Sequence, residues 1–146
     1  MSLSVVSCQW SVVSCFGFWD GIKVMAKPAF QSLHVYRLSE KLSDGIWPLA
    51  REWDDFARDT VGKQLVRAAD SIGANIAEGC GRGSYQDNRR IVRIARGSLN
   101  ETMHWLRRAY SRSLVPAGRV EAIRPLLDEL SPRLNAYLKS IGPKHN

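Results

Sequence analysis

The sequence lacks long apolar runs, paired cysteines and nucleotide-binding fingerprints. No stretch approaches the roughly 18 to 20 apolar residues that cross a bilayer, so we expect a soluble, cytoplasmic protein without membrane contact. The three cysteines (Cys8, Cys15 and Cys80) are odd in number and have no zinc-ligand spacing, which argues against a disulfide framework and a metal site. The glycine-rich loop "GCGRGS" follows a helical pattern and lacks both GK[ST] and GxGxxG, so we expect no nucleotide or other cofactor.

A catalytic constellation is also missing. The candidate side chains near the glycine loop and on the helix after it are Glu78, Cys80, Arg82 and His104. Their order and spacing do not indicate a nucleophile, a base and a group that orients the base. We therefore expect no catalytic residues and no enzymatic activity.

Positive charge is present in excess. The 146 residues contain 21 Lys and Arg against 14 Asp and Glu, which gives a net charge of +7. A basic excess of this size favours polyanionic partners such as nucleic acid, although it does not determine a fold. The length is typical of a single domain with one core.

The first 24 residues differ in composition from the rest. "SVVSCQW" at 4–10 is followed at once by the near-copy "SVVSCFG" at 11–17, without helical periodicity. A signal peptide would carry a positive start and a longer apolar centre. We interpret residues 1–24 as a poorly ordered or spurious N-terminal extension, and residues 25–146 as the domain, starting at Met25.

From Leu33 onward, apolar residues recur at steps of three and four, which predicts four helices. Pro48 is expected to kink the first helix, and "RDTVG" at 58–62 to break the run, with Asp59 or Thr60 capping the next helix. Nothing alternates with period two for long enough to form a strand. The predicted apolar stripes are Val35, Leu38, Leu42, Ile46, Leu49, Trp53 and Phe56; then Val61, Leu65, Ala68, Ile72 and Ile76; and last Val120, Ile123, Leu127, Leu130, Leu134, Tyr137 and Ile141.

Local signals set the other helix ends. The second helix is expected to end at Glu78, with Gly79 at positive φ. Ser84 and Asp87 form a capping box that opens the third helix, which runs to about Arg112. A fourth helix starts near Pro116, and Pro125 and Pro132 bend or shorten it. Short loops between four helices favour an all-α, antiparallel up-down four-helix bundle.

Arginine dominates the third helix, with few acidic neighbours. At 100° per residue, Arg89, Arg93, Arg96, Asn100 and Arg107 fall within a stripe of about 60°. Guanidinium groups suit phosphate geometry, and such a stripe would position nucleic acid without reading its sequence. Two other uses stay open: a solvated face, and pairing with carboxylates such as Glu78 or Glu101 of another subunit. The candidate nucleic-acid-binding residues are Arg82, Arg89, Arg90, Arg93, Arg96, Arg107 and Arg108.

The opposite, apolar side of this helix spans about 160°, which is wider than one bundle core needs. Gly97 and Ser98 in mid-helix would allow another helix to approach closely. Both features suggest a second contact surface and an oligomer.

The stretch "QLVRAADSIGANIAEGCGRGSYQDNRRIVRIARGSLNET" at 64–102 closely resembles the four-helix-bundle family of ribosomal RNA intervening sequences. The resemblance implies a small helical subunit that assembles into a ring-like homo-oligomer, a homopentamer, with a positively charged surface. It also implies a relation to the accessory variability determinant of diversity-generating retroelements, which binds nucleic acid and a reverse transcriptase. The matching positions, expected to be structural or interface residues, are Gln64, Arg67, Ser71, Asn75, Glu78, Gly79, Arg82, Ser98 and Glu101.

Together these features predict a non-enzymatic, oligomeric four-helix bundle that binds RNA or DNA through an arginine-rich surface with little sequence specificity. The alternative is an interaction adaptor, in which the same surface docks an acidic partner such as a reverse transcriptase or a ribosomal component.

Overall fold

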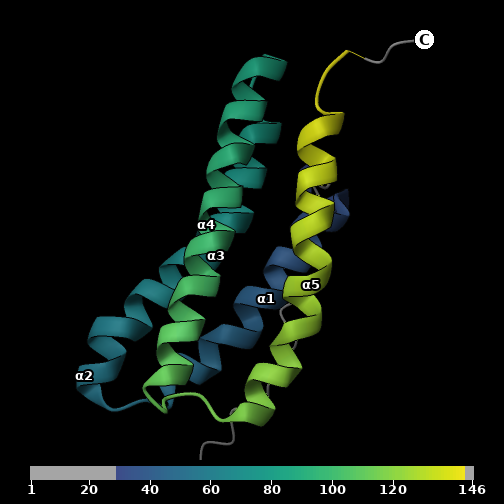
Figure 1. Cartoon of the computed structure of the whole chain (residues 1–146). Coiled ribbons are helices and arrows are strands. Elements are labelled where there is room, and N and C mark those ends of the chain that lie inside the picture. Colours follow the sequence, from purple (N-terminus) through teal and green to yellow (C-terminus); the bar gives the residue numbers. More distant parts are fainter. Residues whose placement is uncertain (1–28, 144–146) are drawn as a thin grey trace, which may run out of the picture.

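The computed structural model describes residues 29–143, which form helices joined by short loops (Figure 1). These residues contain no strand, which confirms the predicted all-α class. The interpretation of residues 1–24 as an extension lies outside the described residues. The elements are the 3₁₀ helix η1 (Ala29–Ser32), α1 (His34–Arg51), α2 (Asp55–Ala57), the π-helical segment η2 (Arg58–Gly62), α3 (Lys63–Cys80), α4 (Tyr85–Ser111) and α5 (Ala117–Ser140).

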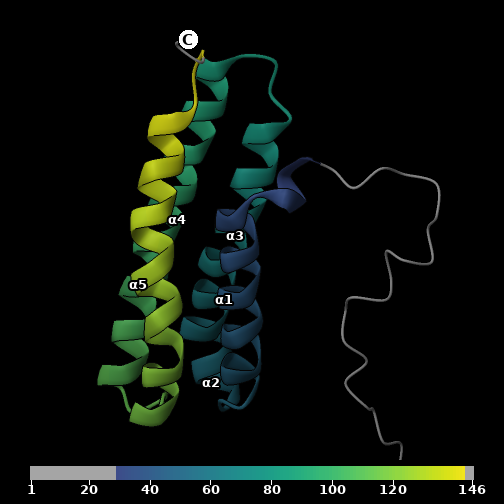
Figure 2. The same cartoon turned by 90° about the vertical axis from the view of Figure 1, so that its right-hand side faces the viewer.

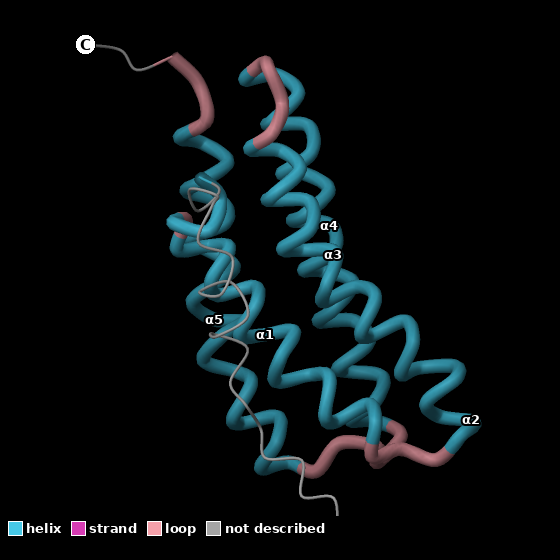
Figure 3. Tube along the Cα trace, turned by 180° about the vertical axis from the view of Figure 1, so that it is seen from behind, coloured by secondary structure: helices cyan, strands magenta, loops and turns pink. Residues whose placement is uncertain are grey.

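The four long helices α1, α3, α4 and α5 stand at the corners of a square. Helix α1 packs against α3 and α5, and α4 packs against the same two helices, so α1 and α4 are diagonal to each other. The two perpendicular views agree with this arrangement (Figures 1 and 2). Successive long helices run in opposite directions, and their connecting loops lie at the two ends of the bundle (Figure 3). The predicted up-down four-helix bundle is confirmed.

The core is built mostly from the apolar stripes predicted for α1, α3 and α5, together with Val92 and Leu99 of α4, which were not among the residues predicted for its apolar side. Burying one such stripe from each helix is what stabilises an up-down bundle, because isolated helices of this length are marginal in water. Each of the four helices contributes at least two fully buried side chains. The largest of them are Leu42 and Ile46 of α1, Leu65, Ile72 and Ile76 of α3, Val92 and Leu99 of α4, and Leu130 and Leu134 of α5.

The connection between α1 and α3 differs from the prediction. The chain breaks at 52–54 rather than at 58–62, and the cap is Asp54, whose carboxylate accepts a hydrogen bond of 2.9 Å from the amide of Ala57. From Asp55 the chain is helical through η2 into α3. This new helix buries Ala57 and turns Phe56 outward, so Phe56 is 79% exposed and the prediction of a core position was wrong.

Glycine 79 has a different role from the predicted one. Helix α3 continues past Glu78 to Cys80, and no glycine among the described residues has positive φ. A Cβ at Gly79 would lie only 2.6 Å from Asn88 Oδ1 and 3.2 Å from Val92 Cγ2 of α4. Gly79 therefore allows α3 and α4 to approach each other. Gly97, where close approach was predicted, has nothing within 4 Å of a Cβ in this chain.

The prolines of the last helix are accommodated inside it. Helix α5 runs without interruption past Pro125 and Pro132, so neither proline shortens it. A proline leaves the carbonyl four residues earlier without its helical hydrogen bond. Here those carbonyls belong to Glu121 and Asp128, which are exposed, so water can satisfy them. Pro48 likewise lies within α1, which continues to Arg51.

Candidate nucleic-acid interface

Helix α4 carries the predicted arginines, and a side-chain cap fixes where it starts. The hydroxyl oxygen of Ser84 accepts a hydrogen bond of 3.1 Å from the amide of Asp87, and the hydroxyl donates to the Asp87 carboxylate at 3.0 Å. This confirms the predicted cap, and the helix ends at Ser111, close to the expected Arg112. Its 27 residues make it about 40 Å long at 1.5 Å per residue. The burial of Val92, Leu99 and Leu106 then fixes which way every other side chain points.

The arginine stripe lies along the seam between α4 and α5. Arg89, Arg93, Arg96 and Arg107 are all exposed. Arg96 Nη1 lies 3.5 Å from Asn135 Oδ1 of α5. Seven residues earlier, Nη2 of Arg89 lies 3.7 Å from the point where a Cβ on Gly142 would stand, just beyond α5. These two contacts place the side of α4 that carries the stripe next to α5.

Helix α5 adds a basic residue that sequence reasoning missed. Lys139 is exposed and lies one turn after Asn135, so it shares the side of α5 that borders the arginines. Arg124 and Asp128 share this side nearer the start of α5. Arg124 makes a 3.9 Å ion pair with Glu121. The i, i+4 spacing of Asn135 and Lys139 is visible in the sequence. This spacing identifies Lys139 as a neighbour of the arginines only once α5 is known to lie beside α4. We call Arg89, Arg93, Arg96 and Lys139 the basic seam.

The other predicted arginines lie elsewhere. Arg90 and Arg108 each follow a stripe residue by one position and so point about 100° away around the helix. Arg90 makes a 3.9 Å ion pair with Asp87. Arg82, in the loop before α4, pairs with Glu78. Arg108 has no ion pair with any residue between 29 and 143, and the same is true of Arg89, Arg93 and Arg107. The seven predicted residues therefore fall into two groups. Arg89, Arg93 and Arg96 belong to the basic seam, and Arg107 continues the same side of α4. Arg82, Arg90 and Arg108 lie away from that side.

The polar positions shared with the resembled family lie on α3 and on the neighbouring part of α4. Within this chain their hydrogen bonds are local: Ser71 Oγ donates to the carbonyl of Arg67 at 2.7 Å, and the amide of Asn75 donates to the carbonyl of Ser71 at 2.6 Å. Such back-bonding satisfies polar side chains without joining two helices.

The remaining matched residues are placed as follows. Ser98 is buried on α4 and its hydroxyl donates to the carbonyl of Ile94 at 3.2 Å. Glu101 is exposed and accepts a hydrogen bond of 3.3 Å from Trp105 Nε1. Gln64 and Arg67 are exposed and make no ion pair or side-chain hydrogen bond with the described residues. Ile94 is 49% exposed and Trp105 half-buried, so part of the wide apolar side of α4 is left uncovered in a single chain.

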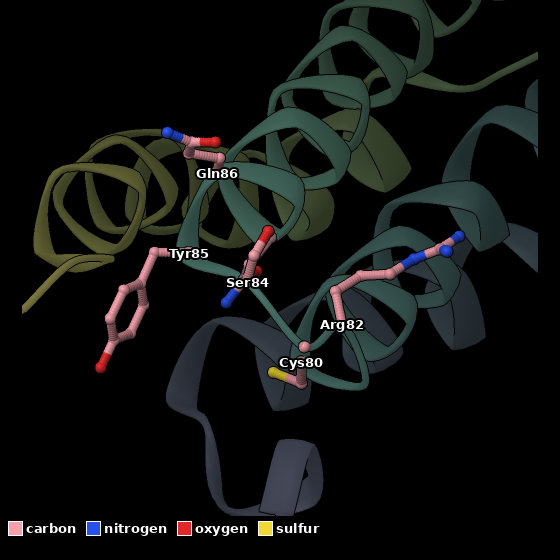
Figure 4. Close-up of a pocket in the computed structure, with 7 residues that line it drawn as sticks. Cys80, Arg82, Ser84, Tyr85 and Gln86 are labelled. Atoms are coloured by element: carbon pink, nitrogen blue, oxygen red, sulfur yellow. The ribbon is translucent and has the colours of Figure 1, made fainter.

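The glycine loop shapes an open hollow of about 670 Å³, lined by residues that include Cys80, Arg82, Ser84, Tyr85 and Asn88. Figure 4 shows the side chains of Arg82 and Tyr85 pointing to opposite sides of the loop, so its polar groups do not converge. Cys80 Sγ lies 3.3 Å from the hydroxyl of Tyr137. Burial, followed by this contact, raises the pKa of Tyr137 to about 12, so the phenol keeps its proton at a pH where an exposed tyrosine loses it.

Of the catalytic candidates named from the sequence, His104 lies far from the other three. His104 lies 20 residues along α4 from Ser84, which is about 30 Å at the rise of an α-helix. It stacks edge-on against Trp105 with ring centroids 5.1 Å apart. Among residues 29–143, no three His, Cys, Asp or Glu side chains are grouped so that they could hold a metal ion. No helix in the same range is long and apolar enough to cross a membrane.

Comparison with known proteins gives a consistent picture. A solved structure from Bacteroides thetaiotaomicron, described as a protein of unknown function from the S23 ribosomal protein family, superimposes with a TM-score of 0.64 at 26% identity, covering 73% of this chain and 99% of that one. None of the curated proteins searched matches this chain. The family model for the 23S rRNA-intervening sequence protein matches residues 31–136, which span the bundle from η1 into the last turns of α5. The chain therefore belongs to the 23S rRNA-intervening sequence protein family.

Proposed function

We propose that this protein binds RNA or DNA through phosphate contacts along the basic seam, without catalysing a reaction. The observation that carries the proposal is the seam itself: three exposed arginines in register on one helix, with Lys139 on its neighbour. None of these four groups makes an ion pair with a described carboxylate. They are free to meet an external anion.

The spacing suits a nucleic-acid strand. Arg89 and Arg96 are seven residues apart, which is about 10 Å along α4. One strand of a duplex presents about three phosphates over that length, since its rise is about 3.4 Å per nucleotide. Three guanidinium groups can therefore each meet one phosphate. Binding would be driven by release of condensed counterions, and would depend little on base sequence because the seam offers few base-reading side chains.

The test is a salt titration of binding. A fluorescent RNA hairpin and a DNA duplex are titrated with the protein by fluorescence anisotropy between 50 and 200 mM salt. The hairpin is the first probe because the family is named for a ribosomal RNA element. Changing Arg89, Arg93 and Arg96 to Gln removes three phosphate contacts, so the log–log salt slope for the DNA duplex is expected to flatten by about 2.7.

The matched control removes the same charge from another face of the bundle. Arg37 and Lys41 are exposed on α1, which is diagonal to α4, and Arg133 is exposed on the side of α5 away from Asn135. Changing these three to Gln should leave the salt slope unchanged. A flattening of equal size in both triple variants would show that net charge, not the seam, drives binding. If the folded wild type binds neither probe at 50 mM salt, the proposal is refuted. The arginines would then be assigned to contacts with an acidic protein partner.

A further inference from the structure

An apolar groove lies between the end of α1 and the start of α3, on the side of the bundle away from the α4–α5 seam. It has a volume of about 250 Å³, and Trp47, Ala50 and Val66 form its apolar part. Engineered apolar cavities of about 150 Å³ hold a benzene ring, so the groove has room for one aromatic side chain. Trp47 is 54% exposed, so nothing in the described chain covers it fully.

The charged residues that line the groove are all cations. Arg51, Arg58 and Lys63 surround its apolar floor, and no carboxylate lines it. Arg58 and Lys63 each pair with an acid of their own helix, Asp55 and Asp59 respectively. Arg51 is exposed and has no ion pair with a described residue. The groove is therefore suited to an aromatic group that arrives with a negatively charged neighbour.

The same chain presents such a group a short distance away. Phe56, at the start of α2, is 79% exposed, which is unusual for so large an apolar side chain. Its neighbours Asp54 and Asp55 are acidic, and the Asp55 side chain is 88% exposed even though it pairs with Arg58. Phe56 does not line the groove of its own chain. Ten residues of helix separate it from Val66, which is about 15 Å at 1.5 Å per residue.

We propose that the groove of one copy receives Phe56 of a second copy, with Asp55 of that copy beside Arg51 of the first. Shape and charge both support a second copy as the occupant, because each chain carries one cation-lined apolar groove and one exposed aromatic flanked by acids. If the contact is reciprocal, two copies close into a dimer. If it repeats head to tail with a rotation that closes, the copies form a ring. The contact uses neither the basic seam nor nucleic acid, so it does not depend on the proposed function.

The first test is the mass in solution without nucleic acid. Size-exclusion chromatography with light scattering at about 100 μM should give a multiple of the 16.4 kDa chain for the wild type. Phe56→Ser should elute as the single chain, whereas Tyr110→Ser, which removes an exposed aromatic from α4, should match the wild type. Arg51→Glu should also weaken the assembly, and Arg37→Glu, an exposed arginine of the same helix, should not. A monomeric wild type, or an oligomer that survives Phe56→Ser, overturns the proposal.

Cross-linking then identifies the contact. Asp55→Cys and Val66→Cys are placed together in a chain that keeps Phe56 and whose Cys8, Cys15 and Cys80 are changed to Ser. The new pair cannot close within one chain, because a disulfide needs Cα atoms within about 7 Å. Oxidation should therefore give covalent multimers on a non-reducing gel. A chain with Tyr110→Cys and Val66→Cys is the control and should stay monomeric on the gel. Equal cross-linking in the two chains would overturn the proposed contact.

Discussion

The close approach of α3 and α4 at Gly79 predicts that adding one methyl group there destabilises the protein. In Gly79→Ala the new Cβ would lie 2.6 Å from Asn88 Oδ1, 3.2 Å from Val92 Cγ2 and 3.4 Å from the backbone carbonyl oxygen of Asn88. Val92 is fully buried and the Asn88 oxygen is itself buried, so both side chains would have to move within the packed contact between α3 and α4. The helices would have to separate or the two side chains change rotamer, at a cost of about 1 to 3 kcal/mol.

Part of that cost is offset because alanine favours a helix interior over glycine by about 0.5 to 1 kcal/mol. The balance is a net loss of about 1 kcal/mol, within a range of about 0 to 2.5 kcal/mol, in the free energy of unfolding. For a domain of this size a loss of about 1 kcal/mol lowers Tm by about 4 °C. Thermal unfolding followed by circular dichroism at 222 nm measures it.

Gly97→Ala provides the matched control, because it makes the same substitution in a helix without the close contact. No atom lies within 4 Å of a Cβ at Gly97, which is exposed in the middle of α4. Only the helix-propensity gain remains, so this variant should be more stable by about 0.5 to 1 kcal/mol. The two substitutions are therefore expected to have opposite signs. A Gly79→Ala variant as stable as Gly97→Ala would refute the packing argument.

Two further predictions concern the cap of α4 and the half-buried phenol of Tyr137 beside α3. Ser84→Ala should lower the free energy of unfolding by about 1 kcal/mol because it removes the acceptor for the Asp87 amide, whereas Ser84→Gly should lower it by only a few tenths. Urea unfolding measures both variants, and equal losses would contradict a side-chain cap. The pKa of Tyr137 is raised to about 12, so the folded state holds this proton more tightly than the unfolded chain, whose phenol has its ordinary value near 10. That contribution to stability is complete below pH 10 and is lost as the pH rises towards 12. The urea midpoint of the wild type should fall more between pH 9 and 11.5 than that of Tyr137→Phe, and an equal fall would contradict a phenol held neutral by burial.

The sequence alone determined the parts of this protein that depend on local spacing. The three-four recurrence of apolar residues identified the four long helices and most of the core in α1, α3 and α5, because a helix needs one continuous apolar face to pack. On α4 it missed Val92 and Leu99. The capping box at Ser84 and Asp87 located the start of α4 for a similarly local reason. Once α4 is helical, its geometry alone puts Arg89, Arg93 and Arg96 on one side, so this part of the candidate interface was also readable.

Tertiary structure decided everything that depends on which helices are neighbours. Lys139 joins the arginines only because α5 packs beside α4, and no local pattern states that pairing. Gly79 was expected to turn the chain, but its role is to admit Asn88 and Val92 of the facing helix, a contact made across the loop. Phe56 fits the apolar period of α1, yet the cap at Asp54 starts a new helix with a different phase and turns the ring outward. Periodicity describes one helix at a time, whereas the packing of α3, α4 and α5 settles which faces are shared and which are left open.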